Sequence, residues 1–431
     1  MAEYDLVVIG GGWAGFNAAL RAKKLGLKAA LIEKSFIGGT CLNLGCIPAK
    51  TLIQSAKVFS LTKKSSDFGV DNLNPSINFL KIQERKTKLV AGLRLGMQSM
   101  LKGVDFFNAE ARVVSPQEIK LGESIIKTKF ILVASGSRPA ELSQLKFDGK
   151  KIVSSNELLA LKEIPASLLI IGGGVIGCEF ASLFSNLGTQ VAIVEKMPRL
   201  LPGEDPEIAK KIENIFKKKG IRVNIDSDVR SVNLDNSNLI LVSVGRSAQA
   251  GSLGLEESGV RLDRGRVIVD EYLKTNIDTI YAAGDCTAKV MLAHFAGYQG
   301  RLAVDNIFAK ANSKKADSSS VPNCIFTDPE IASVGLNEER AIMEGRGINI
   351  NKFDFLGSGM ARILDETQGF LKIISDKRSG VVLGASIIGP KATETIGILT
   401  LAVSCRLTIE QLEKTIFAHP TLSESIGEAL K

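Results

Sequence analysis

The sequence predicts an α/β fold in which one strand–turn–helix–strand unit occurs twice and a sheet of another kind follows. The 431 residues include 41 glycines, and 45% are hydrophobic, a composition typical of multidomain α/β proteins. Residues 6–34 read LVVIGGGWAGFNAALRAKKLGLKAALIEK, and residues 168–196 repeat this pattern as LLIIGGGVIGCEFASLFSNLGTQVAIVEK. Towards the C-terminus, residues 371–374 and 381–388 have the character of strands in an antiparallel sheet.

Each repeat contains a GxGxxG turn between its first strand and its helix. The glycines are Gly10, Gly12 and Gly15 in the first unit and Gly172, Gly174 and Gly177 in the second. The first glycine allows a tight turn, the second lets a pyrophosphate approach the backbone, and the third lets the helix pack against the sheet. One such turn is common without a nucleotide ligand, but two copies in the same context predict two dinucleotide sites.

Each repeat also ends on a glutamate, Glu33 or Glu195, directly after its second strand. A carboxylate there can accept hydrogen bonds from the hydroxyls of an adenosine ribose. Glu195 would repel a 2′-phosphate, so the second site is expected to prefer NAD over NADP. Lys196 and Arg199 follow closely and weaken this preference.

The net charge of +8 does not by itself predict nucleic-acid binding. The lysines cluster only weakly, at 63–64, 217–219 and 314–315, and no aromatic residues interleave with them. This charge fits a solvated surface or the docking of an acidic protein partner. The N-terminus lacks the features of a signal peptide, and no stretch approaches roughly 18 consecutive apolar residues. We therefore expect a cytoplasmic protein that contacts neither membrane nor nucleic acid.

Two of the six cysteines lie close together, in the segment GGTCLNLGCIPAK of residues 38–50. Cys41 and Cys46 have no second cysteine pair and no nearby histidine to complete a zinc site, so redox chemistry is favoured and no metal is expected. A helix is predicted from Lys50 to Thr62, with Pro48 tolerated in its first turn. Thiols near a helix N-terminus have a lowered pKa, which thiol exchange requires. Lys50 shares a helix face with Cys46 and can stabilise a thiolate.

One of the two histidines belongs to the segment HPTLSE of residues 419–424. His419 and Glu424 fit a general base and the carboxylate that orients it, although alone His419 would be interpreted as a surface residue. The four remaining cysteines are expected to be small buried hydrophobic residues. They are Cys178, Cys286, Cys324 and Cys405.

With both glycine turns, the cysteine segment and HPTLSE, the chain resembles the pyridine nucleotide–disulfide oxidoreductases over nearly its whole length. Further matches are ASGSRP at 134–139, YAAGDC at 281–286 and IFTDPEIASVG at 325–335. The resemblance implies two Rossmann-like dinucleotide-binding domains, for FAD and NAD, and a C-terminal α+β dimerisation domain. The implied boundaries are 1–145 and 270–316 for the FAD domain, 146–269 for a shortened NAD domain and 317–431 for the dimerisation domain.

The resemblance also implies roles for the reactive residues. Cys41 would exchange with the substrate and Cys46 would contact the flavin, with Lys50 beside the flavin N5 and paired with Glu179. His419 and Glu424 would serve the disulfide of the other subunit, which implies a homodimer, and the His419–Pro420 bond would be cis.

The residues that the resemblance assigns to the cofactors fall into two sets. The FAD set is Gly10, Gly12, Gly15, Glu33, Lys34, Thr40, Lys50, Ala111, Ser135, Gly136, Ser137, Asp285, Met291, Leu292, Ala293 and His294. The NAD set is Gly172, Gly174, Val175, Ile176, Gly177, Glu179, Glu195 and Gly245. Taken alone, Asp285 and Ser135 also fit ordinary turns, and Met291 and Leu292 also fit a core.

Within the family, MLAH at 291–294 and HPTLSE are most similar to the members that oxidise dihydrolipoamide with NAD. The implied partner is a lipoyl-bearing acyltransferase or glycine-cleavage carrier protein. One alternative is a glutathione reductase or another low-molecular-weight disulfide reductase, which would favour basic residues in place of Glu195. Another is an FAD-containing structural or partner-binding subunit with impaired NAD turnover.

Two departures from the family pattern stand out. The segment between Gly220 and Gly245 ends in a predicted strand from Leu239 to Val244 and is too short for the antiparallel β segment that relatives carry there. A lost hairpin in the NAD domain is therefore expected. Phe417 stands where relatives often have a second histidine.

Overall fold

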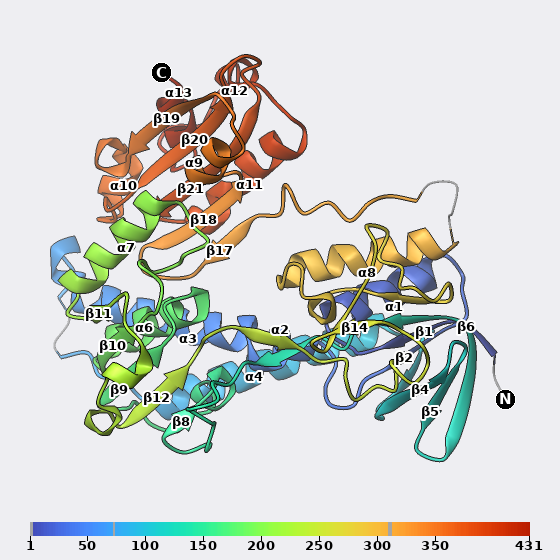
Figure 1. Ribbon diagram of the computed structural model, residues 1–431. Coiled ribbons are helices and arrows are strands. Elements are labelled where there is room, and N and C mark those ends of the chain that lie inside the picture. Colours follow the sequence, from blue (N-terminus) through green and yellow to red (C-terminus); the bar gives the residue numbers. More distant parts are fainter. Residues whose placement is uncertain (1–2, 72–73, 309–312) are drawn as a thin grey trace.

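Three larger β-sheets organise the chain, and each lies in a different part of the molecule (Figure 1). The computed structural model describes residues 3–71, 74–308 and 313–431. No helix in these ranges is both long and apolar enough to cross a membrane.

The first sheet has seven strands, in the order β3-β2-β1-β6-β5-β4 with β16 beside β6. Strands β1, β2, β3, β6 and β16 run parallel, whereas β4, β5 and β6 form an antiparallel meander. The strands are β1 (Glu3–Ile9), β2 (Ala29–Ile32), β3 (Asp105–Phe107), β4 (Ala111–Ser115), β5 (Glu118–Leu121), β6 (Ser124–Val133) and β16 (Ile280–Ala282). β1, β2 and β16 are almost wholly buried, as expected of parallel strands covered on both faces.

The helices of this unit are α1 (Trp13–Lys24), α2 (Gly39–Leu44), α3 (Cys46–Lys63), α4 (Phe79–Met100) and α8 (Ala293–Phe308), with a short turn η1 (Ser65–Phe68). α8 lies directly against α1 (Figure 1). Gly300 makes this approach possible, because a Cβ there would meet the carbonyl oxygen of Ala14 at 2.0 Å. After the second unit, the chain thus returns to the first unit through β16 and α8.

The second sheet is wholly parallel, in the order β11-β10-β9-β12-β8. Its strands are β8 (Ile152–Val153), β9 (Ser167–Ile171), β10 (Gln190–Val194), β11 (Arg222–Asn224) and β12 (Leu239–Val242), and its helices are α5 (Ser155–Leu158), α6 (Val175–Asn186) and α7 (Pro206–Lys218). Residues 225–238 are all described, and they contain only the short turns η2 (Val229–Ser231) and η3 (Leu234–Asn236). Among these described residues no antiparallel strand lies between β11 and β12, and the strand predicted to reach Val244 ends at Val242.

The third sheet is antiparallel throughout, in the order β17-β18-β21-β20-β19. It contains β17 (Asn323–Ile325), β18 (Glu330–Gly335), β19 (Ile348–Asp354), β20 (Phe370–Asp376) and β21 (Val382–Gly389). Around it lie α9 (Glu338–Met343), η6 (Phe355–Gly357), α10 (Gly359–Ile363), α11 (Ala392–Ser404), α12 (Ile409–Glu413) and α13 (Glu424–Leu430). The strands predicted at 371–374 and 381–388 are confirmed as β20 and β21.

A short ladder and a shared hydrophobic core hold the units together. β7 (Ser137–Pro139) pairs antiparallel with β13 (Arg246–Ala248) where the chain enters and leaves the second unit, whereas β14 (Leu262–Asp263) and β15 (Arg266–Val267) form a local hairpin. The shared hydrophobic core contains Leu52 from α3, Phe180 from α6 and Ile325 from β17. All three units therefore meet beside the N-terminal half of α3.

Candidate functional site: two glycine turns and a cysteine pair

The two GxGxxG turns have the same backbone geometry. Gly10 and Gly172 both have φ of +108°, which side chains rarely tolerate. A Cβ on Gly177 would lie 2.0 Å from the carbonyl oxygen of Gly172, so the third glycine permits the close packing of α6. A Cβ on Gly174 would meet nothing within 4 Å, which leaves open space at the N-terminus of α6. This space fits a pyrophosphate held by backbone N–H groups.

The two strand-end glutamates are also held alike. Glu33 accepts hydrogen bonds from the backbone of Gly11 at 2.7 Å and Ser35 at 2.8 Å. Glu195 accepts them from Gly173 at 2.6 Å and Met197 at 2.7 Å. Each carboxylate is fixed at the mouth of its turn and keeps lone pairs for the two hydroxyls of a ribose.

One of the two basic residues that follow Glu195 is already paired with a carboxylate. Arg199 is engaged with Glu339 of the C-terminal unit, with its guanidinium 2.6 Å from the carboxylate. Glu195 itself is buried. This arrangement favours a nicotinamide cofactor without a 2′-phosphate.

Several residues of the predicted FAD set lie at the carboxyl ends of parallel strands. Gly10 follows β1, Glu33 follows β2 and Ser135 lies just beyond β6, so these residues share one edge of the first sheet. Ligands bind at such edges in α/β proteins. Beyond β16, Asp285 accepts a hydrogen bond from Ser137 at 2.6 Å.

The rest of the FAD set lies around this edge. Met291 and Leu292 precede α8, and Ala293 and His294 begin it. Burial lowers the pKa of His294, whose Nε2 lies 2.9 Å from the carbonyl oxygen of Pro322. The others are Thr40 in α2, Ala111 at the start of β4, Gly136 just before β7, and Lys34, 3.6 Å from Glu110.

The two cysteines lie together across the break between α2 and α3. Cys46 is the first residue of α3, which begins four residues before the predicted start at Lys50 because Pro48 fits its first turn. The Cys41 thiol donates a hydrogen bond to the Cys46 sulfur. That hydrogen bond, helped by the Lys50 ammonium, lowers the pKa of Cys46 to about 7. Donating it, together with burial, raises the pKa of Cys41.

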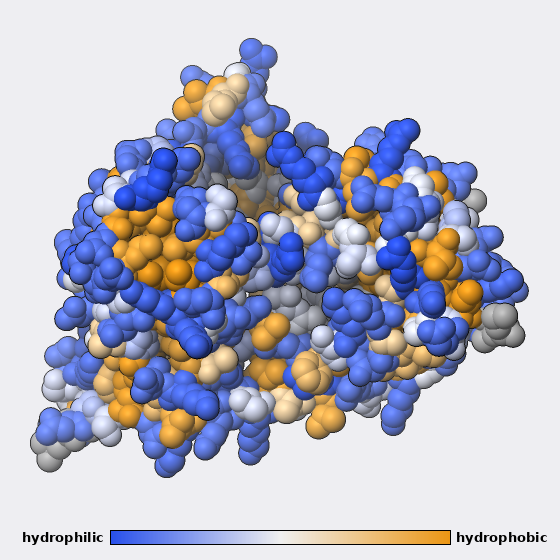
Figure 2. Space-filling view, turned by 60° about the horizontal axis from the view of Figure 1, so that its bottom comes forward, coloured by the Kyte–Doolittle hydropathy of each residue, from blue (hydrophilic) through white to orange (hydrophobic). Residues whose placement is uncertain are grey.

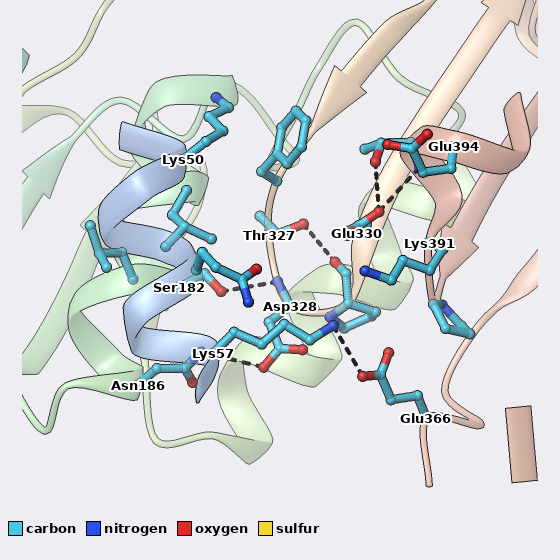
Figure 3. Close-up of a pocket in the computed structure, with 17 residues that line it drawn as sticks. Lys50, Lys57, Ser182, Asn186, Thr327, Asp328, Glu330, Glu366, Lys391 and Glu394 are labelled. Atoms are coloured by element: carbon cyan, nitrogen blue, oxygen red, sulfur yellow. Dashed lines mark hydrogen bonds and ion pairs between the residues drawn. The ribbon is translucent and has the colours of Figure 1, made fainter. Parts of the chain in front are cut away.

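Lys50 and Glu179 form the contact that the resemblance implied. The Lys50 ammonium lies 2.8 and 2.7 Å from the two carboxylate oxygens, and the Glu179 side chain is 7% exposed. The pair joins α3 of the first unit to α6 of the second. It lies beside a cavity of about 190 Å³, with Lys50 at one end and Lys57, Asp328 and Glu366 at the other (Figure 3).

His419 and Glu424 also pair as expected. Nδ1 of His419 lies 2.8 Å from the carboxylate, and the His419 side chain is 78% exposed. The bond between His419 and Pro420 is cis. Among the described residues, no hydrogen bond or ion pair joins His419 to either cysteine of its own chain. Phe417, which stands where relatives often have a second histidine, packs against Gly427.

The expectation for the four other cysteines was partly wrong. Cys178 and Cys286 are buried, and burial raises the pKa of Cys286 to about 11. Cys405 is exposed because it caps the end of α11 at the surface, and Cys324 is only partly buried in β17.

Sequence reasoning missed two residues that the fold brings to the site. Arg246 donates to the Ser137 hydroxyl at 2.7 Å and to its carbonyl oxygen at 2.8 Å, and so braces Ser137 where it holds Asp285. Its position directly after Gly245, a residue assigned to the NAD set, could have indicated that Arg246 lies near the site. Phe326 donates its backbone N–H to Glu179 at 2.9 Å. It belongs to IFTDPEIASVG, but nothing local in the sequence links it to Glu179.

Comparisons with known proteins agree with this geometry. The model of the pyridine nucleotide-disulphide oxidoreductase family matches residues 4–300, and the model of its dimerisation domain matches residues 321–430. A dihydrolipoyl dehydrogenase of Bacillus subtilis is 38% identical over 99% of this chain and 97% of its own length. One of Chlamydia muridarum is 39% identical over 99% of this chain and 96% of its own.

Solved structures show the same architecture. The HOCl-induced flavoprotein disulfide reductase RclA of Escherichia coli superposes with a TM-score of 0.89 at 29% identity, covering 99% of both chains. LpdA of Mycobacterium tuberculosis superposes with a TM-score of 0.91 at 28% identity, covering 100% of this chain and 99% of its own. The paired glycine turns, the cysteine pair and these matches lead to one conclusion: the chain belongs to the pyridine nucleotide–disulphide oxidoreductase family.

Proposed function

We propose that the chain is an NAD-dependent dihydrolipoyl dehydrogenase, which oxidises the dithiol of dihydrolipoyl groups to the disulfide. The observation that carries this proposal is the Cys41–Cys46 pair at the start of α3, beside Lys50–Glu179. The names of the full-length relatives support the same activity. Members of the family use FAD and NAD, and the two glycine turns, each with its glutamate, fit them.

The thiol chemistry requires Cys41 and Cys46 to start as a disulfide. One substrate thiolate attacks Cys41, and the Cys41–Cys46 bond breaks with Cys46 leaving as a thiolate. The second substrate thiolate attacks the substrate sulfur bound to Cys41, which releases Cys41 and the substrate disulfide. With a pKa of about 7, Cys46 is suited to leave as a thiolate at neutral pH. FAD, if held at the first glycine turn with Glu33, would supply the two-electron acceptor that restores the disulfide, and NAD at the second turn with Glu195 would be the final acceptor.

We infer that the active unit is a homodimer. The substrate thiols need a base, and His419 is exposed and paired with Glu424 but contacts no cysteine of its own chain. His419 of the partner subunit is proposed to accept these protons, with the partner's Glu424 stabilising the imidazolium. The nearby side chain of Ile416 is 97% exposed, as expected at a surface that another copy covers. Figure 2 shows that apolar side chains gather in separate patches among hydrophilic ones.

The remaining assignments follow from this activity. The proposed partners are lipoyl-bearing acyltransferases or glycine-cleavage carrier proteins, and the proposed location is the cytoplasm, where thiols stay reduced. The proposed domains are 1–145 with 270–316, 146–269, and 317–431. Pairing of β16 with β6 and packing of α8 on α1 support the divided first domain.

The direct test is steady-state turnover by the purified yellow protein. It should reduce NAD with dihydrolipoamide, and Cys46→Ser should abolish this reaction while leaving FAD bound. Reduction of glutathione disulfide by NADPH, with no lipoamide activity, would replace the proposal with the glutathione-reductase alternative.

A further inference from the structure

The Lys50 ammonium has two partners, and each belongs to a different part of the fold. Lys50 lies on α3 and contacts both carboxylate oxygens of Glu179 on α6. It also lies 4.7 Å from the ring centroid of Phe326, which follows β17 of the C-terminal unit. A cation this close to an aromatic ring is attracted by the ring's quadrupole.

Phe326 also fixes the carboxylate that pairs with Lys50. Its backbone N–H donates to Oε1 of Glu179 at 2.9 Å. Two residues on, the N–H of Asp328 donates to the hydroxyl of Ser182 at 3.0 Å, one helical turn beyond Glu179 (Figure 3). The segment after β17 is therefore fastened to α6 at two points.

The segment is also held from its other side, by the core and by the third sheet. Ile325 is fully buried in the core shared with α3 and α6, and it pairs with Ile331 across the antiparallel β17–β18 ladder. The Phe326 ring lines the cavity next to Lys50. Its position is thus set by the third sheet, although its contacts are with the other two units.

We propose that Phe326 is a positioning residue for the redox site, holding the Lys50–Glu179 pair in place beside Cys46. The inference deepens the proposed function and rests on the role assigned there to Cys46. The amide fixes the carboxylate, and the ring limits the movement of the ammonium towards solvent in the cavity.

Four groups act on Cys46 from the elements around it. Cys41 on α2 donates a hydrogen bond, Lys50 on α3 and Arg246 at the start of β13 carry positive charge, and Glu179 on α6 carries negative charge. Without the ring, Glu179 alone holds the Lys50 ammonium, which can then shift towards the cavity, and its field at Cys46 weakens. The thiolate of Cys46 is then less favoured, so its pKa rises.

The test measures the alkylation rate of Cys46 against pH in the reduced holoenzyme, with peptide mapping to separate Cys46 from Cys41. Phe326→Leu should raise the apparent pKa of Cys46 by roughly half a unit, which lowers its alkylation rate about threefold at pH 6. Phe326→Tyr keeps the ring and should match the wild type. Ile331→Val removes a methyl group from the neighbouring core without facing Lys50, and it too should match. If the leucine variant does not fold, Phe326→Met removes the ring with similar bulk.

An unchanged Cys46 profile in Phe326→Leu would overturn the proposal. Lys50→Met, measured alongside, shows whether the lysine acts on Cys46 at all. Turnover of dihydrolipoamide by the wild type tests the proposed function separately, so failure of the positioning role and failure of the function give different results.

Discussion

At the residue scale, one hydrogen bond makes Cys41 hold its proton and Cys46 lose its proton more easily. Cys41 keeps its proton because it donates to Cys46, and Cys46 is poised to ionise near neutrality. Below pH 7 Cys46 gains a proton, and above it Cys46 is a thiolate. Alkylation of Cys46 should therefore rise with a midpoint near pH 7. Cys41→Ala removes the donor and should move this midpoint upward; a midpoint near that of free cysteine in the wild type would contradict this account.

His419 gives a second prediction at this scale. His419→Gln keeps a hydrogen-bonding side chain but removes the base, so turnover of dihydrolipoamide should fall by about 10²–10⁴-fold. Reduction of bound FAD by NADH does not need that base and should persist. Loss of both reactions would indicate a structural defect rather than a lost base.

At the element scale, two glycines of the second turn have different purposes, one in folding and one in cofactor binding. Gly177→Ala places a Cβ 2.0 Å from Gly172 and should disrupt the packing of α6. Gly174→Ala meets no protein atom within 4 Å, so the fold should survive while the added methyl group blocks the approach of the pyrophosphate. Its Kd for NAD should rise about tenfold or more, equivalent to about 1.4 kcal/mol. Unchanged NAD affinity by calorimetry would place the nucleotide elsewhere.

Much of the site could be predicted because its signals are local. The glycine turns, the cysteine spacing and HPTLSE are each contained within a few residues, and His419 pairs with the nearby Glu424. The Lys50–Glu179 pair spans 129 residues and was predicted only through the family resemblance. Arg246 and Phe326 were missed because neither a local motif nor the resemblance linked them to their partners, Ser137 and Glu179, more than a hundred residues away in the chain. Only the packing of the three units brings them together.

Burial of single residues was harder to predict than the elements that carry them. The strands β20 and β21 and the missing segment before β12 were anticipated from pattern and length. Cys405 was expected in the core because cysteine is usually buried, but it falls at the exposed end of α11. Residue type alone does not fix which face of a helix end meets solvent.

At the scale of the whole molecule, a buried lysine joins the second unit to the third. Lys372 on β20 is 1% exposed and contacts Asp205, which is wholly buried, at 3.1 Å. It also contacts Glu207 at 2.6 Å and Glu338 at 3.1 Å. A partly desolvated cluster of this kind is costly to break because the remaining carboxylate keeps its buried charge.

Lys372→Met should therefore lower the free energy of unfolding by about 3–5 kcal/mol. Lys352→Met is the matched control, since Lys352 makes a more exposed ion pair with Glu207 and its loss should cost below about 1 kcal/mol. Denaturant unfolding at fixed protein concentration measures both. Equal effects would mean that burial of the cluster does not govern its contribution.

The central claim is that a dithiol passes its electrons through Cys41 and Cys46 to FAD and then to NAD. Anaerobic titration of the purified protein with dihydrolipoamide, followed by flavin absorbance and then by addition of NAD, tests it most directly. The account predicts a long-wavelength absorbance band that grows with dithiol and disappears when NAD is added. No change with dihydrolipoamide, together with reduction by NADPH, would contradict both the proposed substrate and the role of Glu195.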